Sequence, residues 1–295
     1  MIIPSAVQNW LDIVYYGRIQ ICFLAMSLAS ASGIILTGQF EWRSILIVGI
    51  ATHVVYNLDN ILDWHAENHL LRLTRSWWTG YFIWCAVTIP IALVGAVFLV
   101  LQSTRELLLV LITLGFIGTG HILLTRYSNG QSEILLWAEH LTVSLIWAMA
   151  TVLIPIYFVG RPVFPQFIRA IVYIWQISWI GVMVRNLSSS ALADDQRKTK
   201  LLAEVLGEQR LIKLLQIVCA STLLLVVFDT LYGYFPWYNI TLTIGPIGIL
   251  VLISKWKYLR NRPRLFETLF YSGGTLGAIL VTAVYYVGGI VYYLS

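Results

Sequence analysis

The sequence predicts an all-α integral membrane protein in which nine transmembrane helices surround a central cavity. Hydrophobic residues make up 59% of the chain and charged residues only 11%, whereas soluble domains carry about 25% charged residues. Apolar stretches recur along the chain, each with about the 20 residues that cross the hydrocarbon core of a bilayer. No linker or low-complexity tract separates them, so residues 1–295 are expected to form a single polytopic domain.

In chain order, the expected spans cover about residues 18–38, 43–62, 78–101, 106–125, 134–158, 166–186, 210–231, 238–255 and 267–293. The second and sixth spans end in polar runs that contain acidic residues. Pro90, Pro155 and Pro246 lie in the third, fifth and eighth spans, where neighbouring helices or water satisfy the carbonyls that a proline frees. Pro236 and the Gly245-Pro246 pair crowd the eighth span, and the count falls by one if they break it.

Basic residues divide unevenly between the two ends of the expected helices. Of the 19 lysines and arginines, all but Arg43, Arg105, Arg161 and Arg169 fall on one side. Because cytoplasmic loops carry the excess of Lys and Arg, that side is expected in the cytoplasm. The N-terminus and the loops after spans two, four, six and eight would then be cytoplasmic, and the C-terminus outside. This asymmetry accounts for the net charge of +5 without a nucleic-acid partner.

An acidic run marks the cytoplasmic end of the second span. Asp59, Asp63 and Glu67 follow one another at intervals of four residues, so they project three carboxylates along one helical face. A carboxylate inside a membrane segment costs about 2.5–3.5 kcal/mol on insertion scales, and such residues usually serve a function. Oxygen ligands suit Mg²⁺, which commonly bridges a carboxylate to a phosphate.

A second polar run follows the sixth span on the same side. It contains Asp194 and Asp195 beside the basic residues Arg197, Lys198 and Lys200. A diphosphate–Mg²⁺ complex requires acids that hold the metal next to bases that neutralise phosphate oxygens. Considered alone, the run is also consistent with an ordinary solvated loop that contains internal ion pairs.

The positions of the two runs favour a shared site. The sixth span comes four spans after the second, so a weak internal duplication would place both runs around one cavity at the cytoplasmic surface. There they would hold Mg²⁺ against a diphosphate, while the apolar tail of the substrate reaches into the bilayer. A transporter would be expected to have ion ligands near the bilayer midplane, whereas the carboxylates here lie at the cytoplasmic ends of the spans. A channel would be expected to have a ring of like charges or a repeated filter loop, and the sequence has neither.

Nine spans with acidic runs after the second and sixth resemble the UbiA superfamily of intramembrane prenyltransferases. The first motif of that family is usually Asn-Asp-x-x-Asp-x-x-x-Asp. Asp59 and Asp63 match its last two aspartates, while Val55 and Tyr56 stand at the first two positions. The resemblance covers nearly the whole chain in architecture.

The second motif of the family is typically Asp-x-x-x-Asp, followed by a small loop and a Leu-rich helix that ends in Gly. With residues 202–207 as the anchor, Asp194 matches the final aspartate and Ser190 stands at the other position. Asn186 lies four residues earlier. The family also tends to have a basic residue that closes the fourth span, and Arg126 stands there.

The resemblance implies Mg²⁺-dependent transfer of a prenyl group from a prenyl diphosphate to a lipophilic acceptor, such as an aromatic or other ring compound, among membrane lipids. It implies catalytic roles for Asp59, Asp63 and Asp194. The implied Mg²⁺ ligands are Asp59, Asp63, Asn186, Asp194 and Asp195. Candidate diphosphate contacts are Arg72, Arg75, Arg126, Arg197, Lys198 and Lys200; for each of these, positive-inside anchoring is the alternative.

Fewer matched carboxylates than in a typical member leave two further functions open. One is a UbiA-like terpene cyclase that ionises a prenyl diphosphate without an acceptor, and the other is a non-catalytic lipid-binding or accessory membrane subunit. Glu67, Asn57 and Asn60 are candidate substitute ligands, because amide oxygens also ligate hard cations. Aromatic residues along the sixth span, among them Trp175 and Trp179, either shield a carbocation or pack the interior.

Overall fold

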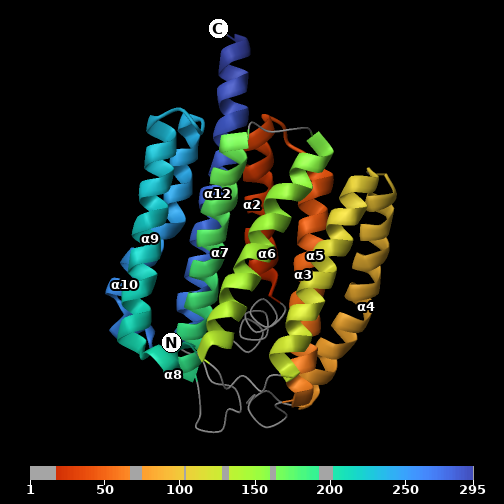
Figure 1. The fold of residues 1–295 in the computed structure, drawn as a ribbon, viewed down its shortest axis with the longest axis vertical. Coiled ribbons are helices and arrows are strands. Elements are labelled where there is room, and N and C mark those ends of the chain that lie inside the picture. Colours follow the sequence, from red (N-terminus) through yellow and green to blue (C-terminus); the bar gives the residue numbers. More distant parts are fainter. Residues whose placement is uncertain are drawn as a thin grey trace.

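Long helices run alternately up and down a single bundle (Figure 1). The structure is a computed structural model, and it describes residues 18–66, 75–102, 104–127, 133–159, 164–192 and 202–294. Within these residues, every regular element is a helix. The helices are α2 (Ile19–Thr37), α3 (Trp42–Ala66), α4 (Arg75–Leu101), α5 (Arg105–Tyr127), α6 (Glu133–Val159), α7 (Phe164–Leu192), α8 (Leu202–Leu206), α9 (Glu208–Leu231), the 3₁₀ helix η1 (Trp237–Thr243), α10 (Ile244–Ser254), α11 (Trp256–Leu259) and α12 (Pro263–Leu294).

Each expected span coincides with one long helix, except that the eighth is divided between η1 and α10. Seven helical segments in the described residues are long and apolar enough to cross a membrane. Neither α3 nor α5 is among the seven. Polar residues of α3, Asn57 and Asp59 among them, lower the hydropathy of that helix. The all-α membrane fold is therefore confirmed, whereas the count of nine transmembrane helices is not.

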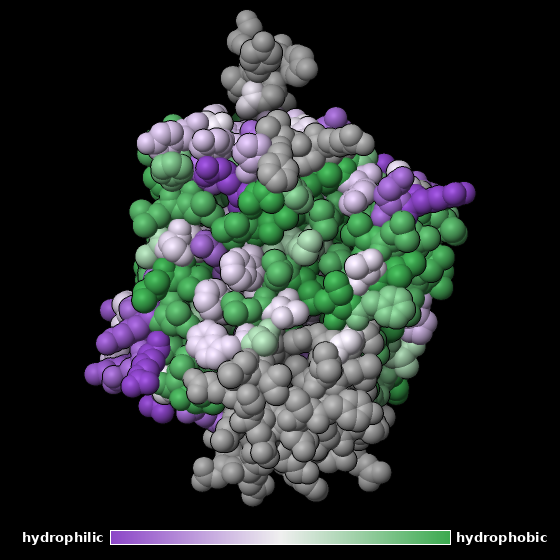
Figure 2. Space-filling model, in the orientation of Figure 1, coloured by the Kyte–Doolittle hydropathy of each residue, from purple (hydrophilic) through white to green (hydrophobic). Residues whose placement is uncertain are grey.

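The outer surface of the bundle is apolar over its middle. On α4, for example, Ile91, Val94 and Phe98 are exposed by 66%, 70% and 62%. In the face that Figure 2 shows, hydrophobic residues cover the centre and the strongly hydrophilic residues gather mainly towards the two ends. A helical bundle in lipid needs this distribution, because the bilayer core solvates apolar side chains and satisfies no polar group.

Helix α2 occupies the interior of the bundle, and α12 packs along it. The two helices are joined by polar contacts at different depths. The Ser30 and Thr282 hydroxyl oxygens lie 2.9 Å apart, and the Thr268 hydroxyl donates to Gln20 Oε1 at 3.2 Å. Interhelical hydrogen bonds of this kind hold helices together where burial of apolar surface gives little driving force. The first and last described long helices are therefore neighbours.

The division of the eighth span between η1 and α10 follows from Pro246. Pro246 lies in the first turn of α10, where the missing N–H of proline is tolerated. It cannot donate to the carbonyl of Leu242, four residues earlier. The Tyr173 hydroxyl of α7 instead donates to that carbonyl oxygen at 3.2 Å. The interruption is thus satisfied by a neighbouring helix, as expected for prolines in membrane helices.

Gly277→Ala is expected to destabilise the protein by about 1–3 kcal/mol, the usual cost of overpacking. A Cβ at Gly277 would lie 2.8 Å from the backbone carbonyl oxygen of Thr241, so α12 and η1 would have to separate. Gly273→Ala on the same helix is the matched control, because a Cβ there meets nothing within 4 Å. Thermal unfolding in detergent micelles measures both. Equal melting temperatures for the two variants would contradict the close α12–η1 contact.

A buried ion pair joins α7 to α9 at the end of the bundle opposite to the acidic run of α3. Arg169, near the start of α7, pairs with Asp229 in the last turn of α9. The Asp229 side chain is fully buried, whereas the Arg169 side chain is 28% exposed. The guanidinium carbon of Arg169 also lies 3.8 Å from the centre of the Tyr234 ring, which is a cation–π contact.

Candidate functional site

The row of α3 residues that leads into the acidic run faces the interior of the bundle. Asp59 is partly buried and lies one turn after Tyr56. Position 63 lies a further turn along the same face. The Tyr56 ring stacks on Trp147 of α6, with ring centroids 5.4 Å apart and planes inclined by 13°. This face of α3 is therefore directed towards α6 and not towards lipid.

A buried ion pair lies beside this row and joins α2 to α12. Arg18, directly before α2, donates from Nη1 to Glu267 Oε1 on α12 at 3.3 Å. Glu267 is completely buried and Arg18 is 7% exposed. The backbone of Arg18 has a φ of 54°, and it is the one non-glycine residue in the described chain with a positive φ. Side chains with a Cβ rarely adopt this conformation.

Two phenols lie among these charges. The Tyr56 hydroxyl interacts electrostatically with the guanidinium groups of Arg185 and Arg18 and with the Asp59 carboxylate. Tyr271 of α12 interacts in the same way with Glu267, with Tyr56 and with both arginines. We call these side chains, contributed by α2, α3, α7 and α12, the polar cluster: Arg18, Tyr56, Asp59, Arg185, Glu267 and Tyr271.

Of the site residues that the sequence predicts, Asp59 is the one that the structure places in the polar cluster. Asp63, Arg75 and Arg126 lie on the described helices α3, α4 and α5, but their side chains lie outside the described part. Six further predicted residues lie outside the described residues altogether: Arg72, Asp194, Asp195, Arg197, Lys198 and Lys200. Their roles stay predictions.

Asn186, a predicted metal ligand, connects the end of α7 to the start of α8. Its Oδ1 accepts a hydrogen bond from the backbone N–H of Leu202 at 3.1 Å, and its Nδ2 donates to the Val182 carbonyl at 3.0 Å. The amide thus satisfies one of the N–H groups that the start of a helix leaves without a partner. One lone pair on Oδ1 is still available, and metal ligation by Asn186 stays a prediction.

Asn57, a candidate substitute ligand, is directed towards α4 and away from the polar cluster. Its side chain is fully buried, and Oδ1 accepts a hydrogen bond from the Tyr81 hydroxyl at 2.6 Å. Its Nδ2 donates to the His53 carbonyl at 2.7 Å and lies 3.1 Å from His53 Nδ1. His53 Nε2 in turn lies 3.0 Å from the Thr88 hydroxyl. This network holds the acidic end of α3 against α4.

Sequence reasoning missed Arg18, Arg185, Glu267 and Tyr271 as site residues. The two arginines were counted only as members of the basic side of the protein. Glu267 carried a usable signal, because a carboxylate at the end of a membrane helix is by default a functional candidate. No signal in the sequence indicates that Glu267 pairs with Arg18, which lies 249 positions away.

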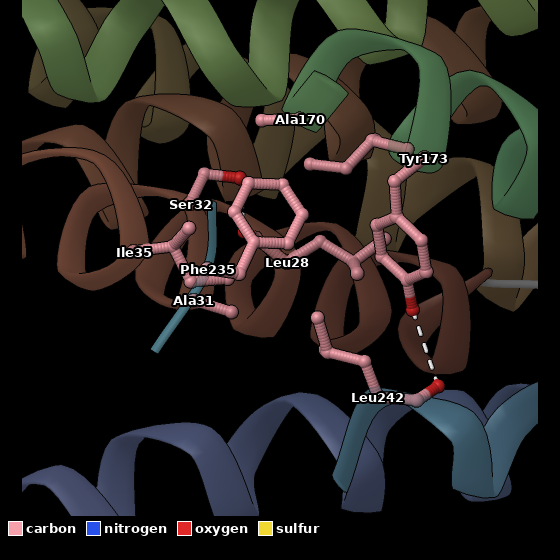
Figure 3. Close-up of a pocket in the computed structure, with 9 residues that line it drawn as sticks. Leu28, Ala31, Ser32, Ile35, Ala170, Tyr173, Phe235 and Leu242 are labelled. Carbon is pink, nitrogen blue, oxygen red and sulfur yellow. Dashed lines mark hydrogen bonds between the residues drawn. The ribbon is translucent and has the colours of Figure 1, made fainter. Parts of the chain in front are cut away.

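A small apolar cavity lies deeper in the bundle, between α2, α7 and the η1 region (Figure 3). Leu28 lines it about 15 Å along α2 from Arg18, counted at the helical rise of about 1.5 Å per residue. Tyr173 and Leu242, joined by their hydrogen bond, form another part of the wall. The cavity measures about 10 Å³, room for at most one water. A prenyl chain does not fit there without rearrangement.

The residues available for a metal fit Mg²⁺ by their donor chemistry. Asp59 offers a carboxylate on the interior face of α3, with position 63 one turn away. Among the described residues, no three His, Cys, Asp or Glu side chains converge on one point. The side chains of Asp63 and Asp194, two of the predicted ligands, lie outside the described part, and their ligation of a metal stays a prediction.

A helical bundle with an apolar outer surface and several helices long enough to cross a bilayer defines a multi-pass membrane protein, and comparison with solved structures shows a fold that it shares. The solved structure in question is that of a digeranylgeranylglyceryl phosphate synthase, which superposes with a TM-score of 0.55 over 92% of this chain and 99% of that chain. The sequences are 11% identical. At this identity the similarity shows the fold, and it confirms the predicted helical membrane architecture. No protein-family profile and no curated protein sequence matches the chain.

Proposed function

We propose that the protein transfers a prenyl group from a prenyl diphosphate to a lipophilic acceptor within the membrane. The carrying observation is the fold shared with a digeranylgeranylglyceryl phosphate synthase along nearly the whole chain. The polar cluster supports the proposal, because it lies at the end of α3 that carries the acidic run and combines carboxylate, guanidinium and phenol groups. An aromatic or other ring compound is the acceptor class that we propose.

The proposed roles follow the chemistry of each side chain. Asp59 and Asp63, one turn apart on α3, would hold Mg²⁺ together with Asp194, and Asn186 and Asp195 would complete the ligand set. The metal, when bound, neutralises the diphosphate and stabilises the charge that develops on its leaving oxygen. The predicted diphosphate contacts on the loops and helix ends would fix the remaining oxygens: Arg72, Arg75, Arg126, Arg197, Lys198 and Lys200.

The proposed orientation places the acidic runs in the cytoplasm. It rests on the excess of Lys and Arg on that side, which includes the exposed residues Lys255, Lys257, Arg260 and Arg262 around α11. A diphosphate head group would then enter from water, while the prenyl chain stays at bilayer depth. The C-terminus would lie outside.

The test is incubation of the purified protein with prenyl diphosphates of several chain lengths, with and without Mg²⁺, while diphosphate release is measured. We expect release that requires Mg²⁺, is lost on addition of a chelator and is accompanied by a prenylated acceptor. Release with a cyclic hydrocarbon as product and no acceptor would favour the cyclase alternative. Absence of release with every chain length would refute catalysis and leave lipid binding as the function.

A further inference from the structure

Basic residues gather on the outer surface where α9 begins and α10 ends. Six of them have exposed side chains, and we call these the basic patch: Arg210, Lys213, Lys255, Lys257, Arg260 and Arg262. In Figure 2, strongly hydrophilic side chains project at the lower left of the molecule, where α10 ends in Figure 1. Two acids lie on the adjoining helices, Glu204 of α8 and Glu208 of α9. The patch therefore keeps a clear excess of positive charge.

Glu208 holds the two parts of the basic patch together. Its Oε1 accepts a hydrogen bond from the Trp256 indole N–H of α11, and its Oε2 lies 3.3 Å from Arg260 Nη2. The start of α9 and the short helix α11 are therefore neighbours, although Glu208 and Trp256 are 48 residues apart in sequence. Within the described residues, Arg260 is the one member of the patch that forms an ion pair.

The basic patch borders directly on the apolar outer surface of the bundle. One turn away from it, each of the three neighbouring helices exposes an apolar side chain: Ile217 on α9, Val251 on α10 and Leu265 on α12. Tyr258, which lies between the bases of α11, is 84% exposed. Tyrosine is enriched at the level of lipid head groups, where its ring meets apolar surface and its hydroxyl meets water. The bases therefore lie at head-group depth, at the edge of the surface that contacts lipid.

We infer that the basic patch binds anionic phospholipids of the surrounding bilayer. The lysines and arginines contact the phosphodiester groups, while the acyl chains lie along the exposed apolar faces of α9, α10 and α12. Like charges this close repel one another, and the lipid phosphates relieve that repulsion. Such a lipid lies outside the bundle, needs no metal and is not consumed. The inference therefore neither rests on the proposed prenyl transfer nor requires it.

The geometry favours a lipid over a soluble acidic partner. A nucleic acid or an acidic protein in water would meet the charges of the patch but would leave Ile217 and Val251 to the bilayer. A phospholipid meets both, because its phosphate and its acyl chains span the same boundary as the patch. Topology explains an excess of bases on one side of a membrane protein. It does not require that bases from two distant segments converge, as the contacts of Glu208 show that they do.

The experiment titrates phosphatidylglycerol or phosphatidylcholine into neutral detergent micelles of the full chain and counts bound lipid by native mass spectrometry. For the wild type we expect an affinity for phosphatidylglycerol at least about tenfold above that for phosphatidylcholine, since each Lys or Arg near anionic lipid contributes about fivefold. Lys255→Gln/Lys257→Gln should lower the affinity for phosphatidylglycerol about tenfold or more. Lys255→Arg/Lys257→Arg keeps both charges and should bind as the wild type does.

Arg43→Gln/Arg105→Gln is the matched control, because it removes two bases at the opposite end of the bundle. Its affinity for phosphatidylglycerol should equal that of the wild type. Melting temperatures without added lipid separate binding from folding. The Lys255→Gln/Lys257→Gln variant should melt as the wild type does, because both lysines are exposed and form no ion pair within the described residues. Binding of phosphatidylcholine should be the same in every variant.

Three outcomes would overturn the inference. The wild type could bind both lipids equally, or the Lys255→Gln/Lys257→Gln variant could bind phosphatidylglycerol as tightly as the wild type. The third outcome is that a short oligonucleotide or polyglutamate binds the patch and displaces phosphatidylglycerol, which would assign the surface to a soluble acidic partner. Diphosphate release measured in phosphatidylcholine alone tests the proposed function separately, so the failure of either proposal leaves the other standing.

Discussion

Asp63→Ala is expected to abolish metal-dependent diphosphate release, with a loss of at least about 100-fold, the scale seen when one group that stabilises transition-state charge is removed. Asp63 is placed one turn beyond Asp59 on the interior face of α3, so it is the proposed second carboxylate for Mg²⁺. Asp59→Ala should cause a loss of similar size. Single-turnover release from a prenyl diphosphate at saturating Mg²⁺ is the measurement.

Glu106→Ala is the matched control for this prediction. Glu106 is an exposed carboxylate in the first turn of α5, at the other end of the bundle, so its removal changes the net charge equally. Release should be unchanged in this variant. If Asp63→Ala and Glu106→Ala release diphosphate at the wild-type rate alike, the acidic run of α3 is not the metal site, and the proposed mechanism is wrong.

Arg169→Leu is expected to destabilise the protein by about 3–5 kcal/mol, because it leaves the fully buried carboxylate of Asp229 without its partner. Asp229→Asn should cost less, since the Arg169 side chain that it leaves unpaired is 28% exposed and also rests on the Tyr234 ring. The double variant Arg169→Leu/Asp229→Leu should recover much of the stability, since neither charge is left alone. Equilibrium unfolding by titration with a denaturing detergent gives the three values.

The pair of Glu41 and Arg43 serves as the control for this second prediction. Both side chains are partly exposed, at 15% and 30%, and they lie two residues apart in sequence. Exposed pairs contribute only about 0–1 kcal/mol, so Arg43→Leu should have a small effect. An effect of Arg169→Leu no larger than that of Arg43→Leu would show that α7 and α9 do not depend on the buried pair.

The helices were predictable from sequence because membrane spans are encoded locally. An apolar run of sufficient length has no alternative to a helix in lipid, so the bounds of α2 and α9 lie within two residues of the predicted spans. The division at η1 could not be predicted from the local sequence alone, since it depends on Tyr173 of another helix reaching the Leu242 carbonyl. Helix α3 was predicted as a span over residues 43–62, and the polar residues near its end, Asn57 and Asp59 among them, lower its hydropathy.

Only those site residues that lie together on one helix could be predicted from the sequence. The four-residue interval of Asp59 and Asp63 fixes a common face without any tertiary information. The direction of Asn57 towards Tyr81, by contrast, depends on which neighbour α3 meets on that side. The contact of Arg18 with Glu267 depends on the packing of helices at the two ends of the described chain. No local pattern encodes which of several charged residues meet across such a distance.

The neighbouring positions of α2 and α12 have a consequence for biogenesis. Helices are inserted in the order of synthesis, so Arg18 is in the membrane region long before Glu267 has been translated, 249 residues later. The Ser30–Thr282 and Gln20–Thr268 contacts likewise close only at that late stage. Contacts of such high sequence separation form slowly, since the intervening chain must first be ordered. The contacts of the interior helix are therefore completed last, and a polypeptide released before α12 would lack the Glu267 carboxylate that pairs with Arg18.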